Sequence, residues 1–269
     1  MVVPAPPAMT PAERWRAAVR SLAVPAELLE RAPDQSPPLE PQRFRWRPDE
    51  DAKQAVRPSR RRALEALPEG GTILDVGVGG GASSFGLAPK AGLIVGVDPL
   101  EGMLEAFTAS GQEVGVATRA VLGRWPDVAA EVGVADVAVC HHAVHGVEAV
   151  EDFLAALTAH ARRRVVIEVS ASSPLAQLNP LWKLLHGLDR PDPAVADDLH
   201  AVIESMGLAV EREDVVLPPR APEVTPDLVA FARRRLYVGP EHDADIEAWL
   251  RARRPADHLV AALWWPGGG

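Results

Sequence analysis

The sequence predicts an α/β fold in which helices cover both faces of a doubly wound, mostly parallel sheet. From residue 58 onward, short apolar runs alternate with apolar stripes at helical spacing. The first of these runs also leads directly into a glycine-rich turn. Parallel strands need long crossover connections, which are usually helices, so this alternation indicates a parallel sheet covered by helices.

The first 57 residues lack this regular pattern. Residues 12–24 favour a short helix with Trp15 on its apolar face, and residues 25–31 favour a second helix. Five prolines follow within residues 33–48. Because proline removes a backbone donor and blocks helix formation, we expect an extended arm that lies over a core. Residues 1–57 are therefore interpreted as an N-terminal helical and proline-rich arm.

Seven apolar runs within residues 58–269 predict the strands of the sheet. They span residues 72–76, 93–97, 117–122, 136–140, 164–169, 208–217 and 258–265. The predicted helices begin at Pro58, follow the second strand over residues 100–107 and close at Gly111, cover residues 147–157, and end at Gly207. Two more helices are expected between the last two strands, the first of them opening at Thr225.

The connection after the fifth strand, residues 170–193, is long for its place. It contains a helical pattern over residues 180–188. One interpretation is an inserted cover segment that closes over a substrate. The other is a packing helix that buries Leu181, Leu184 and Leu185 against the sheet.

Composition excludes several classes of function. Lys and Arg number 28 against 37 Asp and Glu, which gives a net charge of -9 and disfavours a nucleic-acid partner. The single cysteine excludes a disulfide framework and a cysteine-rich zinc site. Because we find neither a membrane span nor a leader pattern, we expect a cytoplasmic protein without a membrane partner. The oligomeric state is open.

The glycine-rich turn runs from Asp75 to Ala82 with the sequence DVGVGGGA. Glycine suits such a turn because a ligand can approach the main chain without meeting a Cβ atom. We also expect the loop to present its N–H groups at the positive end of a following helix. A turn without a ligand is the alternative, although four glycines exceed what a turn requires.

Asp98 ends the second predicted strand, about 20 residues after this loop, where an acid accepts hydrogen bonds from ribose hydroxyls. The alternative is an N-cap for the next helix, because Asp98-Pro99 also suits a helix start. The glycine loop and the acid together predict a ligand that contains a nucleoside.

Three segments resemble the class I S-adenosylmethionine-dependent methyltransferases: ILDVGVGGG at residues 73–81, VGVD at 95–98 and ADVAVCH at 135–141. The resemblance covers residues 58–170 well. Asp75 distinguishes this family from nicotinamide-binding folds, which usually have a small or apolar residue at that position. The resemblance implies a Rossmann-like methyltransferase fold with seven strands and an antiparallel strand at the C-terminus, and it implies S-adenosylmethionine as the cofactor.

The resemblance also implies roles for individual residues. It places Gly77, Gly79 and Gly81 near the methionine and ribose portions of the cofactor, and Asp75 at the methionine end. Asp98 would bind the ribose hydroxyls.

At the end of the fourth strand, Cys140 and His141 would lie beside the methionine amine and the methyl group. The chain departs from the family after the third strand, where Gly123-Arg124-Trp125 replaces a common Gly-Asp pair. Trp125 is either a stacking partner for adenine or a core residue.

His141, His142 and His145 follow the fourth strand at the edge of the sheet where ligands bind. They have three interpretations: metal ligands, a general base for an oxygen or nitrogen nucleophile, or polar residues of the pocket wall. The sequence offers no further cluster of acids or cysteines to complete a metal site, so none is predicted. His142 and His145 are the candidate catalytic residues.

The function predicted from these residues is methyl transfer from S-adenosylmethionine to an unidentified acceptor, with a small molecule favoured. Protein and RNA acceptors remain open. Two alternatives belong to other classes: a nicotinamide-dependent oxidoreductase with a Rossmann domain, against which Asp75 argues, and an S-adenosylmethionine-binding protein without catalysis.

Overall fold

The computed structural model describes residues 8–33, 41, 44–48, 57–173, 175–218, 223–254 and 257–269. Most of the proline-rich segment 33–48 lies outside the described residues, so the extended arm stays a prediction there. Residues 44–46 are described, and they cross the glycine loop: the N–H of Trp46 donates to the carbonyl of Gly80 at 3.4 Å.

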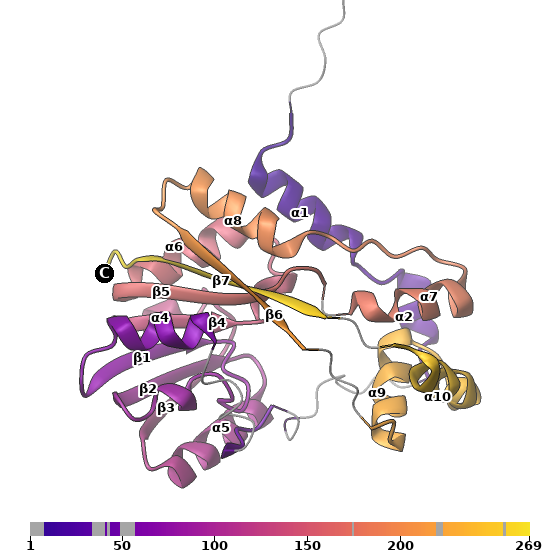
Figure 1. Cartoon of the computed structure of the whole chain (residues 1–269), viewed down its shortest axis with the longest axis horizontal. Helices are drawn as coiled ribbons and strands as arrows, with labels where there is room; N and C mark the ends of the chain where they lie inside the picture. The colour runs from indigo at the N-terminus through magenta and orange to yellow at the C-terminus, as the bar shows by residue number, and fades with distance from the viewer. Residues whose placement is uncertain are drawn as a thin grey trace, which may run out of the picture.

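The described strands form a seven-stranded sheet in the order β3-β2-β1-β4-β5-β7-β6 (Figure 1). The strands are β1 (Gly71–Val76), β2 (Ala91–Asp98), β3 (Ala117–Leu122), β4 (Ala135–His141), β5 (Ala161–Ser170), β6 (Glu211–Leu217) and β7 (His258–Pro266). β1 to β5 pair in parallel, whereas β7 pairs antiparallel with both β5 and β6. The predicted α/β fold is confirmed, including the antiparallel C-terminal strand.

Helices cover both faces of the sheet, and each face has its own apolar core. Alternate strand residues point to opposite faces, so Leu74 packs into one core and Ile73 into the other. The helices of the first core are α1 (Pro11–Ser21), α6 (Val150–Ala159) and α8 (Val195–Ser205), and those of the second are α4 (Pro58–Ala66) and α5 (Glu101–Val114). Within the described ranges, no helix combines the length and apolarity needed to cross a membrane.

Two local predictions about this region are wrong. α5 does not close at Gly111 but continues to Val114, and its C-cap Gly115 adopts a left-handed conformation. Gly111 is instead a packing position, because a Cβ atom there would lie 2.4 Å from Thr118 of β3.

The glycine loop is also not followed by an α-helix. Residues 77–90 form turns and one short 3-10 helix, η2 (Phe85–Leu87). Gly86 and Pro89 lie in this stretch, and both residue types have low helix propensity. The loop N–H groups therefore gain nothing from the dipole of an α-helix.

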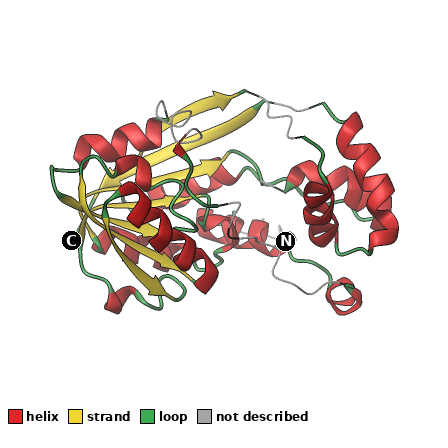
Figure 2. Ribbon diagram, turned by 90° about the horizontal axis from the view of Figure 1, so that it is seen from below, coloured by secondary structure: helices red, strands yellow, loops and turns green. Residues whose placement is uncertain are grey.

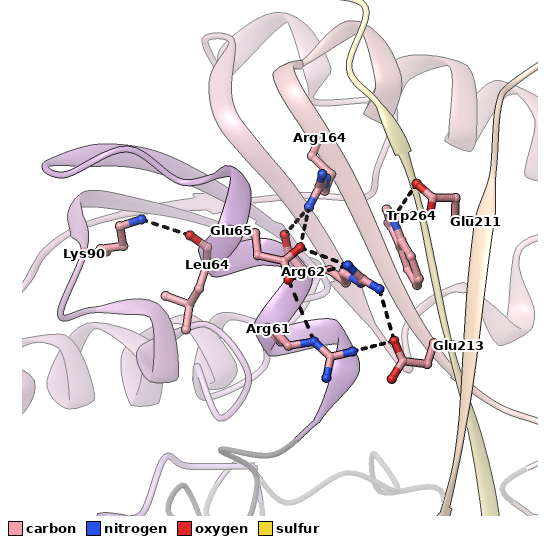
Figure 3. Close-up of polar contacts among 9 residues, drawn as sticks. All are labelled: Arg61, Arg62, Leu64, Glu65, Lys90, Arg164, Glu211, Glu213 and Trp264. Carbon is pink, nitrogen blue, oxygen red and sulfur yellow. Dashed lines mark hydrogen bonds and ion pairs between the residues drawn. The ribbon is translucent and has the colours of Figure 1, made fainter.

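Ion pairs fasten α4 to the far edge of the sheet (Figure 3). Glu213 of β6 accepts from Arg61 at 2.5 Å and from Arg62 at 3.4 Å. Arg164 of β5 donates to the carbonyl of Arg62 at 2.8 Å and to Glu65 at 3.3 Å. These contacts hold the helix in one position, and its N-terminal end therefore reaches the carboxyl end of β5.

Four further helices form a separate group beyond the carboxyl end of β5 (Figures 1 and 2). They are α2 (Ala26–Arg31), α7 (Asn179–His186), α9 (Pro226–Leu236) and α10 (Asp243–Ala252). Buried residues of α7, α9 and α10 pack with one another, and the partly buried Leu28 of α2 packs against them. Leu181 belongs to this cluster. The interpretation in which Leu181, Leu184 and Leu185 bury against the sheet is therefore wrong. Leu184 is 67% exposed, and Leu185 packs against the helical cluster.

Trp15 attaches α1 to the main core. Its side chain is 2% exposed, and its indole N–H donates to the carbonyl of Val147 at 2.6 Å. The helix begins with a capping box between Thr10 and Glu13. The N-terminal helix is therefore an integral part of the fold, and it lies beside α8 (Figure 1).

We expect Trp15→Ala to lower the free energy of unfolding by about 3 kcal/mol or more, because it removes a buried aromatic side chain. Trp15→Phe is the matched variant. It keeps most of the apolar contact, loses the hydrogen bond to Val147, and should cost about 1–2 kcal/mol. Urea unfolding followed by circular dichroism measures both values. Equal stabilities of Trp15→Ala and the wild type would contradict this role.

Candidate functional site

A cavity of about 540 Å³ lies at the carboxyl ends of the parallel strands. It lies near the boundary between β1 and β4, where the strand order changes direction. Open α/β sheets bind ligands at this switch point because the connecting loops diverge there. Six of the predicted site residues line the cavity: Gly77, Gly79, Asp98, Trp125, His141 and His142. Of the other predicted residues, Asp75, Gly81, Cys140 and His145 are not among the described residues that line it.

The glycines of the loop have different tasks. Gly79 has a φ of 52°, and among the described residues a Cβ atom built there would meet only Phe44, at 3.5 Å. A side chain at Gly79 would therefore extend into the region that a ligand needs. Gly81 has a φ of 81°, and a Cβ atom there would lie 2.0 Å from the ring of Phe85. Gly81 is thus required for packing behind the loop.

Asp98 ties the end of β2 to the glycine loop. Its carboxylate accepts the N–H of Gly79 at 3.0 Å and the N–H of Leu100 at 3.0 Å, one on each oxygen. Burial raises the pKa of Asp98, while the two N–H donors act in the opposite direction. Leu100, not Asp98, is the N-cap of α5, so the helix-cap interpretation is wrong. Each oxygen keeps acceptor capacity for a ligand hydroxyl.

Asp75 lies beneath the loop and is 1% exposed. Burial raises the pKa of Asp75 to about 7. Its Oδ2 atom and the hydroxyl of Ser84 are both buried without a hydrogen-bond partner among the described residues. Buried polar atoms without partners are costly, so this pair would gain from a ligand or a bridging water.

Trp125 combines the two environments that the sequence offered as alternatives. It is 8% exposed and packs in the main core, and its indole N–H donates to the carbonyl of Phe153 at 3.1 Å. It also lines the cavity. The hydrogen bond fixes the ring, so any ligand that stacks on Trp125 meets a rigid surface.

At the end of β4, adjacent residues face different surroundings. Cys140 is fully buried in the main core, and burial raises the pKa of its thiol. His141 lines the cavity, and burial lowers its pKa to about 4. Its imidazole is therefore neutral at neutral pH, and Nε2 is buried without a partner among the described residues. This nitrogen is a candidate contact for a polar ligand group.

His142 is held by a buried carboxylate that the sequence analysis did not identify. Glu168 of β5 contacts Nε2 of His142 at 3.1 Å and also binds Arg57 and Ser59, at the start of α4. Burial opposes ionisation of Glu168, but its hydrogen bond with His142 and the charge of Arg57 outweigh this effect and lower its pKa. A carboxylate only accepts, so the Nε2 atom of His142 carries the proton. In neutral His142, Nδ1 is then free to accept a proton.

A second cavity of about 1240 Å³ adjoins the first. It lies between the carboxyl end of β5 and helices α9 and α10, and Phe44 and His142 line both cavities. His145 also lines the second cavity, and burial lowers its pKa to about 4. Its Nδ1 lies 3.2 Å from the carbonyl of His142 and must donate to it, which leaves Nε2 as an acceptor.

Glu168 and Arg57 are the main residues that sequence reasoning missed. Glu168 interrupts the apolar run Val165-Val166-Ile167, and a single acid inside a buried strand was the available signal. Arg57 gave no signal, because its role depends on the packing of α4. No group of three or more histidine, cysteine, aspartate or glutamate side chains in the described part of the chain is arranged to hold a metal ion.

The residues present fit the cofactor that the sequence resemblance implied. Gly79 leaves space beside the cavity, Asp98 keeps acceptor capacity, and the partnerless atoms of Asp75 and His141 lie at or beneath its wall. These features match a ligand with ribose hydroxyls and a charged amino acid portion.

Comparison with protein families gives a match to a family described as methyltransferase domain, over residues 74–166. No curated protein matches the sequence. Among solved structures, the YcgJ protein from Bacillus subtilis has a TM-score of 0.52 and 16% identity, covering 78% of this chain and 99% of that chain.

Two other structures have lower TM-scores. A methyltransferase from Thiobacillus denitrificans, in complex with S-adenosyl-L-homocysteine, has a TM-score of 0.47 and 18% identity, covering 89% of this chain and 98% of that chain. Magnesium protoporphyrin IX methyltransferase from Synechocystis, with bound S-adenosyl-L-homocysteine, has a TM-score of 0.48 and 16% identity, covering 79% of this chain and 86% of that chain.

The matched residues 74–166 contain the glycine loop, Asp98 and the histidines after β4. The strand order agrees with the fold that the sequence resemblance implied, and the YcgJ structure shares this fold. Residues 74–166 therefore match a methyltransferase domain, and the chain is similar in fold and motifs to the class I S-adenosylmethionine-dependent methyltransferases.

Proposed function

We propose that the protein transfers a methyl group from S-adenosylmethionine in the first cavity to an oxygen or nitrogen nucleophile of a small molecule in the second. The observation that carries this proposal is the junction of the two cavities at His142 and Phe44. Methyl transfer needs the donor and acceptor in line, and adjoining cavities supply that positioning. The net charge of -9 favours a small molecule over nucleic acid.

Bound S-adenosylmethionine supplies an electrophilic methyl group, which a nucleophile takes while the sulfur keeps the electrons of the broken bond. The chain's own residues provide binding and proton transfer. Asp98 accepts the ribose hydroxyls, Trp125 offers a flat surface to the adenine, and His141 contacts the amino acid portion. His142 takes the proton of the nucleophile on Nδ1, and Glu168 stabilises the imidazolium that forms.

A nicotinamide-dependent oxidoreductase is less compatible with the glycine loop. In dinucleotide-binding folds the pyrophosphate lies at the N-terminus of the helix that follows the loop. Here that segment forms turns and the three-residue η2. The buried carboxyl group of Asp75 beneath the loop would also repel an anionic pyrophosphate when it is ionised.

The cofactor assignment predicts a clear difference between ligands. In calorimetric titrations, S-adenosylmethionine and S-adenosylhomocysteine should bind saturably, whereas NAD and NADP should give no binding heat. Saturable binding of NAD at micromolar concentration would overturn the proposal.

Gly79→Val extends this test, because it should abolish cofactor binding by placing a branched side chain in the cavity. The matched control is Gly115→Val. Gly115 also has a positive φ, of 78°, but no atom of the described part of the chain lies within 4 Å of its Cβ position. The control should share the backbone strain and keep its affinity.

Asp98→Ala should weaken binding of S-adenosylhomocysteine by about ten-fold to a few hundred-fold, because charge-assisted hydrogen bonds are each worth about 1.5–3 kcal/mol. Asp98→Asn should give an intermediate loss. Glu105→Ala, on the exposed face of α5, is the control and should bind normally. Titration and thermal unfolding of the same variants separate a loss of affinity from a loss of stability. Unchanged affinity of Asp98→Ala would remove this residue from the site.

His142→Gln should lower the rate of methyl transfer by about 10²–10⁴-fold, the usual contribution of a general base, with the affinity for S-adenosylhomocysteine unchanged. The assay follows tritium from methyl-labelled S-adenosylmethionine into a mixture of phenols, hydroxy acids and amines. His200→Gln on α8 lies outside both cavities and is the control. A normal rate for His142→Gln would exclude it as the base. If the wild-type protein binds the cofactor but transfers nothing, a binding protein without catalysis is favoured.

A further inference from the structure

The second cavity has a chemical character that differs from that of the protein as a whole. Its wall on the side of α9 and α10 contains three arginines, Arg235, Arg253 and Arg254, together with the rings of Phe231 and Trp249. The chain has a net charge of -9, so a group of arginines around one cavity is a local reversal of charge.

Two acids also line this cavity, but neither forms an ion pair with these arginines among the described residues. Asp192 accepts the N–H of Ser173 at 3.1 Å, and Asp257 is exposed. The wall therefore keeps positive charge that is available to a ligand.

Arg235 is the member of this group that has an unsatisfied buried polar atom. Its Nε atom is buried and has no hydrogen-bond partner among the described residues. Its guanidinium lies 5.5 Å from the centroid of the Phe231 ring. Burial lowers the pKa of Arg235, which means that its surroundings disfavour the cation, although an arginine stays charged at neutral pH.

Other arginines of the same helices are paired. Arg233 donates to Asp243 at 2.6 Å, and Arg251 donates to Glu247 at 2.7 Å. Arg253 donates to Gln177 at 2.7 Å and lies over Trp249, so it is held in place by a neutral partner. The buried Nε atom of Arg235 is costly unless a ligand supplies a hydrogen-bond acceptor.

The opposite wall of the same cavity carries His142 and His145, together with Ser170 and His258. One side of the cavity thus offers proton acceptors for a nucleophile, and the other side offers cations and aromatic rings. A guanidinium matches the two oxygens of a carboxylate better than a single point charge does.

We propose that the methyl acceptor is an aromatic carboxylate, with its carboxylate bound by Arg235 and its nucleophilic hydroxyl or amino group directed to His142. This inference rests on the proposed function, because it assigns the second cavity to the acceptor. Phe231 and Trp249 provide the apolar surface for the ring.

The test uses three hydroxylated probes of increasing size, 4-hydroxybenzoate, 4-hydroxycinnamate and 6-hydroxy-2-naphthoate, each paired with its primary amide. They are titrated into the whole protein after saturation with S-adenosylhomocysteine. At least one carboxylate should bind about ten-fold or more tightly than its amide, which corresponds to about 1.4 kcal/mol. Arg235→Gln should remove this preference, and Arg235→Lys should retain part of it. The matched control Arg251→Gln, whose arginine is paired with Glu247 and lies outside the cavity lining, should keep the preference in full.

Equal binding of carboxylates and amides, or no binding of either, would overturn the proposal. So would an undiminished preference in both Arg235 variants. The titration with S-adenosylhomocysteine that precedes each experiment distinguishes a failure of the proposed function from a failure of the acceptor assignment. If that cofactor product fails to bind, the proposed function fails, whereas normal cofactor binding without a carboxylate preference overturns only the assignment of the acceptor.

Discussion

The buried carboxylate of Glu168 is the contact on which the rest of the site depends. It lies in β5 and joins three separate segments, through Arg57 before α4, Ser59 within α4 and His142 after β4. A buried carboxylate is stable only when its oxygens are paired, so Glu168 forces these segments to converge. Loss of Arg57 would leave the charge of Glu168 uncompensated, and loss of Ser59 or His142 would remove a hydrogen bond from its buried carboxylate.

The cofactor side of the site rests on a second contact, between Asp98 and the glycine loop. The carboxylate binds the N–H of Gly79 and so fixes the loop, which has no α-helix behind it, against the end of β2. Asp98 thereby shapes the first cavity, and its oxygens can still accept hydrogen bonds from a ligand in it. Only part of the glycine run lines the first cavity, because Gly81 is needed for packing against Phe85.

The helical group beside the second cavity is built differently, from segments far apart in the chain. The helical group draws α2 from the N-terminal region, α7 from the connection after β5, and α9 and α10 from the connection between β6 and β7. Its apolar core is separate from the two cores of the sheet. One wall of the second cavity comes from this group of helices, so proteins that share the sheet need not share this cavity.

The sequence by itself determined the seven strands, the glycine turn and the position of Asp98, because strand periodicity and turn chemistry are local properties of the chain. Tertiary structure decided the rest. Gly111 lies within α5, where Thr118 of β3 occupies the space that a Cβ atom would need. The partners of Glu168 and the unsatisfied Nε atom of Arg235 arise only when distant segments meet. Burial and pairing are non-local, so no pattern of neighbouring residues contains them.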